Sequence, residues 1–163
     1  MKKLSARCEA MAGFVDAGES VADIGADHAY VPIFLVREGV SPFAVLTDVN
    51  PGPLEKTRAS VEKAGVGGVD LRLGDGLSVL DKAEVDTVII AGMGGETIIS
   101  ILSADPVKAG SFRKYILQPR TKTELLERWL ADSLWKVLAK TAAEERGRIC
   151  DIIVCAPKEE KND

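Results

Sequence analysis

The sequence predicts an α/β fold in which helices cover both faces of a mostly parallel, seven-stranded sheet. Short apolar runs alternate with helical patterns five times along the chain, which is typical of parallel strands joined by helices. Glycine turns follow several of these apolar runs. The last two apolar runs flank a charged turn at 144–148 and indicate an antiparallel hairpin that closes the sheet.

Length and composition are those of a single globular domain. The 163 residues are 46% hydrophobic and 28% charged, which is enough to bury a core without disulfides or metals. We expect the domain to cover residues 1–156 and a charged tail to follow at 157–163. The net charge of −4 argues against a surface that binds nucleic acid all over, whereas a local basic patch is compatible with it.

Cysteine usage and the N-terminus predict a cytoplasmic protein without a metal site. Cys8, Cys150 and Cys155 show no paired spacing and the chain has one histidine, so the sequence does not indicate zinc. An odd cysteine count without a framework fits a reducing compartment. The N-terminus has no apolar leader and no run of 18 apolar residues occurs, so we expect no contact with membranes.

The first half of the chain is expected to form three helices and three strands. Apolar residues at helical spacing between Leu4 and Val15 indicate the first helix, and Pro51 and Pro53 suit the first turn of the third. The expected elements are a helix at 4–15, a strand at 20–25, a helix at 33–38, a strand at 44–48, a helix at 54–63 with Leu54, Ala59 and Val61 facing the core, and a strand at 69–73.

The second half is expected to add the central strand and the hairpin. The run at 86–91 is the most hydrophobic and should lie in the middle of the sheet. Pro119 is expected to close the fifth strand, Thr123 to cap the helix after it, and Trp129 and Trp135 to lie in the core. The expected elements are a helical turn at 77–80, a strand at 86–91, a helix at 96–103, a strand at 114–118, a helix at 123–130 and hairpin strands at 135–140 and 149–155.

The closing hairpin separates two classes of cofactor-binding sheet. A dinucleotide-binding Rossmann domain does not end in an antiparallel hairpin. The sheet of the class I S-adenosylmethionine-dependent methyltransferases does. The sequence therefore predicts a Rossmann-like class I methyltransferase fold.

The stretch 21–30 joins the first strand to a helix through one glycine with acids around it. Gly25 forms the turn, Asp23 and Asp27 flank it, and Asp48 ends the next strand, where an acid can accept hydrogen bonds from ribose hydroxyls. The full GxGxxG pattern is absent, and the acids would repel a pyrophosphate but attract a sulfonium and an ammonium. The pattern favours S-adenosyl-L-methionine over NAD. The structural alternative is that Gly25 is a plain turn and Asp27 caps the helix that follows.

A second turn, Gly74-Asp75-Gly76, follows the third strand. Its acid can accept a hydrogen bond from the exocyclic amine of adenine, and its glycines let the base lie close to the backbone. An aspartate–glycine pair is also common in ordinary turns, so this signal depends on the neighbouring strand ends.

A third glycine turn ends the central strand. Ala91, Gly92, Met93 and Gly94 let the backbone approach a ligand and direct the following helix towards it. In this architecture that strand end faces both the sulfonium and the methyl acceptor. The sequence has no Asn-Pro-Pro-Tyr, which points away from methylation of an exocyclic amine and is silent on ring nitrogens.

Two groups of residues are candidates for handling the acceptor. His28, the one histidine, lies in the cofactor turn and can orient a base or take up a proton, although a lone histidine is often an ordinary surface or core residue. Tyr30 can stack on a base or ribose. Gln118, Pro119 and Arg120 end the fifth strand and can contact the acceptor or RNA, while Arg120 can equally pair with a surface acid.

Four motifs occur in an order that resembles a known family. They are the run DIGADHAYVP at 23–32, Gly74-Asp-Gly76, the run IAGMGG at 90–95 and Leu117-Gln-Pro119. The chain resembles the bacterial tRNA (adenine-22-N1)-methyltransferase family (TrmK) from about residue 4 to residue 156. The resemblance implies methyl transfer from S-adenosylmethionine to the ring nitrogen N1 of an adenine in tRNA.

The resemblance also assigns roles to the candidate residues. The sulfonium is already an activated donor, so alignment and a route for the proton are the tasks left to the enzyme. The methylated base is cationic, and a carboxylate such as that of Asp27 can stabilise the developing charge. The implied roles are Asp23, Gly25 and Asp27 at the methionine end, Asp48 at the ribose, Asp75 and Gly76 at the adenine, Gly92, Met93 and Gly94 beside the methyl group, and His28 and Tyr30 at the acceptor.

The resemblance has one departure. Family members continue into a helical, coiled-coil-like C-terminal domain that helps to hold tRNA, and this chain ends at Asp163. Together with the acidic net charge, this departure predicts that the chain binds tRNA weakly or with the help of a partner. The chain is then a shortened form, a minimal homologue or an enzyme with another acceptor. A methyltransferase for a small molecule or protein, and a non-catalytic module that binds S-adenosylmethionine and works with a partner, are the alternative functions.

Overall fold

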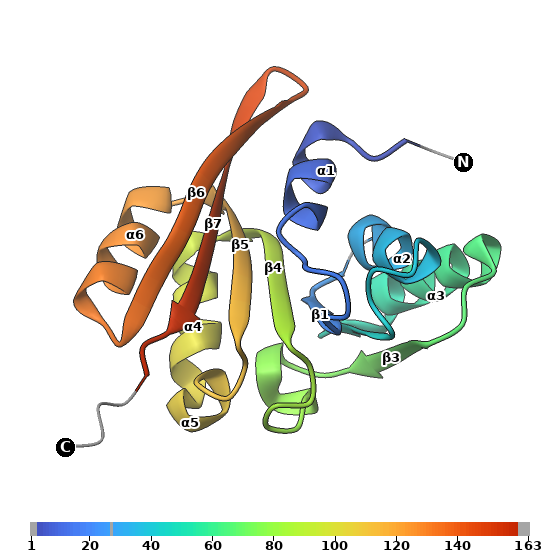
Figure 1. The fold of residues 1–163 in the computed structure, drawn as a ribbon, viewed down its shortest axis with the longest axis horizontal. Coiled ribbons are helices and arrows are strands. Elements are labelled where there is room, and N and C mark those ends of the chain that lie inside the picture. Colours follow the sequence, from blue (N-terminus) through green and yellow to red (C-terminus); the bar gives the residue numbers. More distant parts are fainter. Residues whose placement is uncertain (1–2, 27, 160–163) are drawn as a thin grey trace.

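The computed structural model describes residues 3–26 and 28–159 and has the expected Rossmann-like methyltransferase architecture. Seven strands form one sheet in the order β3-β2-β1-β4-β5-β7-β6, with β7 antiparallel to its neighbours and the other adjacent pairs parallel (Figure 1). The elements are α1 (Ala6–Ala12), β1 (Val21–Ile24), α2 (Tyr30–Arg37), β2 (Ala44–Asp48), α3 (Pro51–Ala64), β3 (Val69–Leu73), the 3₁₀ turn η1 (Gly76–Val79), β4 (Thr87–Gly94), α4 (Gly95–Ala104), α5 (Pro106–Ala109), β5 (Lys114–Thr121), α6 (Thr123–Asp132), β6 (Trp135–Glu145) and β7 (Arg148–Pro157).

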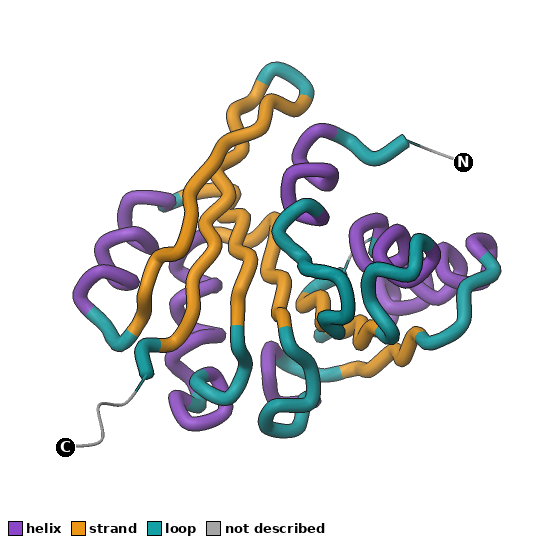
Figure 2. Tube along the Cα trace, viewed as in Figure 1, coloured by secondary structure: helices purple, strands orange, loops and turns teal. Residues whose placement is uncertain are grey.

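Helices cover both faces of the sheet and make two cores. The helices α1, α2 and α3 pack on one face, while α4, α6 and η1 pack on the other (Figure 2). All four residues of β1 are buried, as are the first four of β4, which is expected when a parallel sheet is covered on both sides. Among the described residues no helix is long and apolar enough to cross a membrane.

The strands β4 and β5 run further than expected. The two strands stay paired past Ala91 and Gln118, with register shifts that bring Met93 opposite Pro119 and Gly94 opposite Thr121. These irregularities accommodate a proline that cannot donate a ladder hydrogen bond. Pro119 therefore lies inside β5 rather than closing it, and the glycines of 92–94 belong to β4.

Three helices begin or face differently from the expectation. Tyr30 begins α2, ahead of the expected start at residue 33, so Pro32 lies in the first turn of that helix. Thr123 is the first residue of α6 and makes no capping hydrogen bond, because Lys122 precedes it as the cap with φ 57°. In α3 Thr57 is buried in place of Ala59, and its hydroxyl donates to the Ala26 carbonyl at 2.7 Å.

The closing hairpin is longer than expected and projects beyond the sheet. Only Ile153–Cys155 of β7 pairs with β5, while the hairpin itself stays paired up to Glu145 and Arg148. Its outer end stands beside α1 and beyond the carboxyl ends of the parallel strands (Figure 1). Trp135 is buried and Trp129 packs against the same core, as expected.

Arg72 connects the edge strand β3 to the loop that follows η1. Its guanidinium donates to both carboxylate oxygens of Glu84, at 2.8 and 2.5 Å, and to the Val79 carbonyl at 2.8 Å. The side chains of Arg72 and Glu84 are 25% and 22% exposed, so solvent screens this ion pair only in part. The arginine holds the pKa of Glu84 below its usual value.

Replacing this arginine should destabilise the domain. Arg72→Met should lower the free energy of unfolding by about 2 kcal/mol at pH 7, because the Val79 carbonyl loses the arginine donor and Glu84 is left with the bond from the Asp81 amide. Since the Glu84 pKa is depressed in the folded state, the difference from the native chain should shrink as the pH falls below 4.5. Urea unfolding measures it. Arg58→Met, which breaks an exposed pair with Glu55, is the control and should change little.

Candidate functional site

A pocket of about 690 Å³ opens at the carboxyl ends of β1 to β4, where α4 forms its other wall. It is lined by five residues predicted from the sequence: Gly25, Asp48, Asp75, Gly76 and Met93. The strand order reverses between β1 and β4, and at such a point the two crossovers leave in opposite directions and open a crevice. The topology therefore places the three glycine turns around one cavity.

The turn after β1 requires glycine. Gly25 has φ +70°, and a Cβ built on it would lie 2.5 Å from the Met93 Cε. The amides of Gly25 and Ala26 donate to the Thr47 carbonyl at 3.0 and 3.1 Å, which ties the turn to β2. The backbone is thus left bare towards the pocket, where a ligand can approach it closely.

Two acids stand at the β2 and β3 ends of the pocket. Asp48 is the last residue of β2, is half-buried, and accepts from the Asn50 amide at 3.0 Å. Asp75 is exposed and precedes η1, while Gly76 is buried with φ +54° against Ile101. The arrangement offers a carboxylate on either side of a narrow glycine-lined wall.

Asp23 lies two residues before the turn and is buried rather than part of the pocket wall. It is 9% exposed, and its carboxylate receives no hydrogen bond from the residues that the structure describes. Burial raises the Asp23 pKa to about 7, and the nearby Arg7 opposes this shift. A buried carboxylate without donors is costly to ionise, and a ligand cation would relieve that cost.

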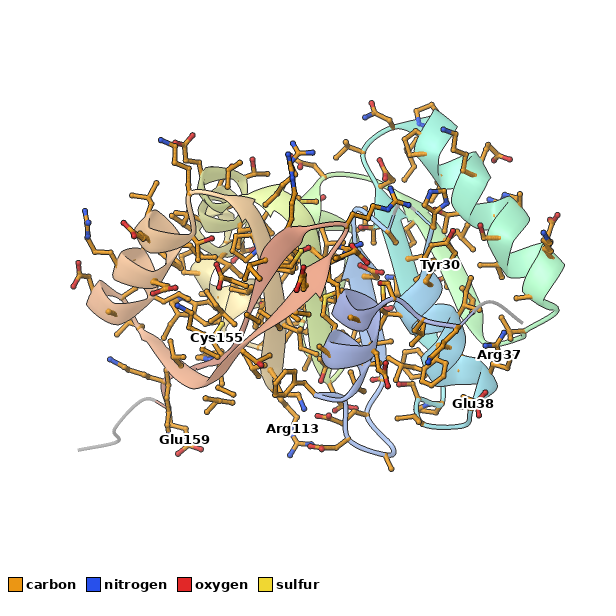
Figure 3. The ribbon with its side chains drawn as sticks, turned by 90° about the horizontal axis from the view of Figure 1, so that it is seen from above. Tyr30, Arg37, Glu38, Arg113, Cys155 and Glu159 are labelled. Atoms are coloured by element: carbon orange, nitrogen blue, oxygen red, sulfur yellow. The ribbon has the colours of Figure 1, made fainter. Side chains whose placement is uncertain are left out.

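His28 and Tyr30 come together at the start of α2. Their rings are stacked, with centroids 5.2 Å apart and 14° between the planes, and both side chains are exposed. Tyr30 stands at the α2 end of the molecule in Figure 3. Neither residue lines the pocket. Asp27, predicted for the methionine end and for catalysis, lies outside the described residues, and its roles stay predictions.

The remaining predicted residues lie at the ends of β4 and β5. Ala91, Gly92 and Gly94 flank Met93 without lining the pocket themselves. Gln118 and Pro119 are buried, so the structure does not present these two to a substrate, whereas Arg120 is exposed. The Gln118 side chain accepts from the Arg7 Nη1 at 2.8 Å and donates to the Pro119 carbonyl at 3.1 Å.

Sequence reasoning missed several residues around the pocket. Thr97 and Ile101 of α4 line it, and their position in the helix after the central strand was the signal that could have found them. Thr47 also lines it, and its buried hydroxyl has no hydrogen-bond partner among the described residues. Arg7 reaches Gln118 from 111 residues away, which no local pattern predicts.

Comparison with known proteins places the chain in a family. A family model described as a methyltransferase domain matches residues 4–153. The tRNA (adenine(22)-N(1))-methyltransferase of Bacillus subtilis (strain 168) is 35% identical over 153 residues, which are 93% of this chain and 64% of that protein. The chain therefore spans less than two thirds of the length of this curated relative.

Solved structures agree with the sequence relatives. The crystal structure of the B. subtilis m1A22 tRNA methyltransferase TrmK superposes with a TM-score of 0.88 at 34% identity, covering 96% of this chain and 68% of that one. TrmK of M. capricolum, in complex with the cofactor product S-adenosyl-homocysteine, superposes with a TM-score of 0.84 at 28% identity, covering 99% and 74%. By these matches the chain belongs to the methyltransferase domain family, in the group of the tRNA (m1A22) methyltransferases.

Proposed function

We propose that this chain binds S-adenosylmethionine and transfers its methyl group to the ring nitrogen N1 of an adenine in tRNA. The observation that carries the proposal is the set of carboxylates around a glycine-lined pocket at the point where the strand order reverses. The B. subtilis and M. capricolum relatives support the reaction and the cofactor, respectively.

The pocket chemistry fits this cofactor better than a dinucleotide. Asp48 and Asp75 line the pocket and Asp23 is buried two residues before the Gly25 turn, and such a concentration of carboxylates repels a pyrophosphate. Asp48 is placed to accept from ribose hydroxyls, and Asp75 to accept from the adenine amine beside the buried Gly76. The Asp23 carboxylate, which receives no hydrogen bond from the described residues, suits the ammonium at the methionine end, across Gly25.

The chain's own residues have a positioning task. When bound, S-adenosylmethionine supplies an activated methyl group on a positively charged sulfonium. Gly25 and Met93 close the pocket at the turn after β1 and set how far a ligand can enter it. Orientation of this kind supplies much of the catalysis when the donor is already activated.

The stacked rings of His28 and Tyr30 support a site for the acceptor base. Both are exposed and parallel at the edge that carries the pocket, so a base that leaves its RNA stack can lie against them. Methylation at N1 makes the base cationic, and a carboxylate from Asp27 would stabilise that charge. Arg120, exposed at the end of β5, is the predicted contact to the RNA backbone.

A tRNA-modifying role places the protein in the cytoplasm. How tightly the chain holds tRNA stays a prediction, to be measured by filter binding at two salt concentrations, because phosphate contacts weaken as salt rises.

Nucleoside analysis tests the reaction directly. Unmodified tRNA incubated with the chain and S-adenosylmethionine should gain N1-methyladenosine, read by mass spectrometry of the digested RNA. tRNA that already bears the modification should gain none, and Asp48→Ala should lower the signal about 10-fold or more at limiting cofactor. Methylation of another nucleoside, or of protein only, would contradict the proposed acceptor.

The acids at the ribose and adenine should contribute affinity rather than stability. Asp48→Ala and Asp75→Ala should each weaken binding of S-adenosylmethionine about 10-fold or more, since each removes a charge-assisted hydrogen bond. The melting temperature without ligand should move by less than about 3 °C, because neither side chain is part of the core. Calorimetric titration measures the affinity, with Glu62→Ala on α3 as the control. Unchanged affinity for both variants would place the cofactor elsewhere.

Asp23 should lower the stability of the folded protein while it strengthens binding of S-adenosylmethionine. Its pKa is raised in the folded state, so ionising it lowers stability progressively as the pH rises from 3.8 to about 7. Asp23→Asn should therefore raise the free energy of unfolding of the ligand-free protein at pH 8 by at most about 4 kcal/mol, with a higher melting temperature, and the gain should disappear near pH 4. The same variant should bind S-adenosylmethionine more weakly. Thermal melts across pH measure it, and a destabilised variant at pH 8 would show that the carboxylate is structural.

A further inference from the structure

Arg7 joins four separate parts of the fold beside the methyl-transfer end of the site. From α1, its Nε donates to Glu145 Oε2 at 2.9 Å, at the outer end of the hairpin. Its Nη1 donates to Gln118 Oε1 at 2.8 Å, at the end of β5. Its charge also acts on Asp23 of β1. The residues it connects are 111 and 138 positions away in the sequence, so the junction exists only in the folded chain.

We infer that Arg7 is a positioning residue that braces the end of β5 and the hairpin against α1 and keeps the Asp23 carboxylate available to a ligand cation. The inference rests on the proposed function, because the cation is the ammonium of S-adenosylmethionine. Arg7 lies outside the cofactor motifs, so the inference gives the N-terminal helix α1 a role at the site.

The geometry explains how a guanidinium serves both purposes. Gln118 stands opposite Ala91 in the β4–β5 ladder, one step before the irregular stretch that carries Met93. Fixing the Gln118 amide between Arg7 and the Pro119 carbonyl holds that stretch in place. Two bonds at separate nitrogens suit the fork of arginine, and lysine would carry the charge without making both.

Charge balance at Asp23 depends chiefly on this arginine. Asp23 is buried and receives no hydrogen bond from the described residues, and Arg7 is the opposing charge that lowers its pKa. Other ionisable groups on these elements are Cys8 and Glu9 on α1, His28 at the turn before α2, Tyr30 and Arg37 on α2, and Glu144, Glu145, Arg146 and Arg148 at the end of the hairpin, with Asp27 outside the described residues. Glu145 is paired with Arg7 itself and so offsets part of its charge.

Removing the charge should make ligand binding more dependent on pH. If Arg7→Met raises the Asp23 pKa from about 7 by roughly one further unit, the ionised fraction falls about eightfold at pH 6.5 but less than twofold at pH 8.5. We expect the affinity for S-adenosylhomocysteine, relative to the native chain at the same pH, to fall in the same proportions. Calorimetric titration of the full chain at both pH values measures the two ratios.

Three further variants separate charge from packing. Arg7→Lys should restore the native pH dependence while losing one bond of the brace. Glu145→Gln removes the negative charge that partly neutralises Arg7. At pH 6.5 this variant should therefore bind S-adenosylhomocysteine at least as tightly as the native chain does. This variant tests the inference even where Arg7→Met does not fold. Arg58→Met, at an exposed pair on α3, should leave both ratios near one.

The outcomes distinguish this inference from the proposed function. An equal loss of affinity at both pH values in Arg7→Met would show a role in packing alone and would overturn the inference. No loss of affinity in Arg7→Met would also overturn it. So would a loss of affinity at pH 6.5 in Glu145→Gln. A native chain that does not bind S-adenosylhomocysteine would instead overturn the proposed function.

Discussion

The parallel pairing of β1 with both β2 and β4 is the constraint on which the rest of the structure depends. β1 is buried along its whole length, and its two neighbours receive crossovers that pass on opposite faces of the sheet. The crevice at its carboxyl end follows from that pairing, and so does the meeting of three glycine turns that are far apart in the sequence. Once β1 is in register, Gly25, Asp48 and Met93 have no other place to lie than around one pocket.

Electrostatics then decides what the crevice can hold. Carboxylates gathered at strand ends are unfavourable in the empty site, and Asp23 shows the cost most clearly because burial raises its pKa to about 7. A cationic ligand would offset this cost, since it adds positive charge beside Asp23 beyond that of Arg7. The same carboxylates disfavour the phosphate groups of other cofactors that use this topology. Destabilised polar groups at a binding site are a common result of selection for function rather than for stability.

The parts that could be predicted from the sequence are those set by local physics. β2 and β3 begin and end where expected because apolar periodicity and flanking turns agree there. The acids and glycines of the pocket were found because a turn and a charged residue can both be recognised in a short stretch of sequence.

The features that the sequence did not predict depend on tertiary contacts. The extension of β4 and β5 was missed because pairing between two irregular strands offsets the usual effect of Gly92 and Pro119. Thr57 was missed as a buried residue because its hydroxyl is satisfied by the Ala26 carbonyl, which only the tertiary structure brings near. The buried position of Gln118 was missed because its partner, Arg7, lies in another helix.

The N-terminal helix α1 and the outer end of the closing hairpin meet through Arg7 and Glu145, and this contact has a physical consequence. The bond between Arg7 and Glu145 closes a loop of 138 residues, so its entropic cost is met only after the sheet has formed. The brace on Gln118 shares the same guanidinium and therefore forms at the same late stage. The β2–β3 side of the pocket has no such dependence, because β2, β3 and η1 are neighbours in the sequence and Arg72 holds β3 to the segment around η1. One side of the site is thus built from local contacts and the other from the completed fold, and the second side is the one where we propose that methyl transfer takes place.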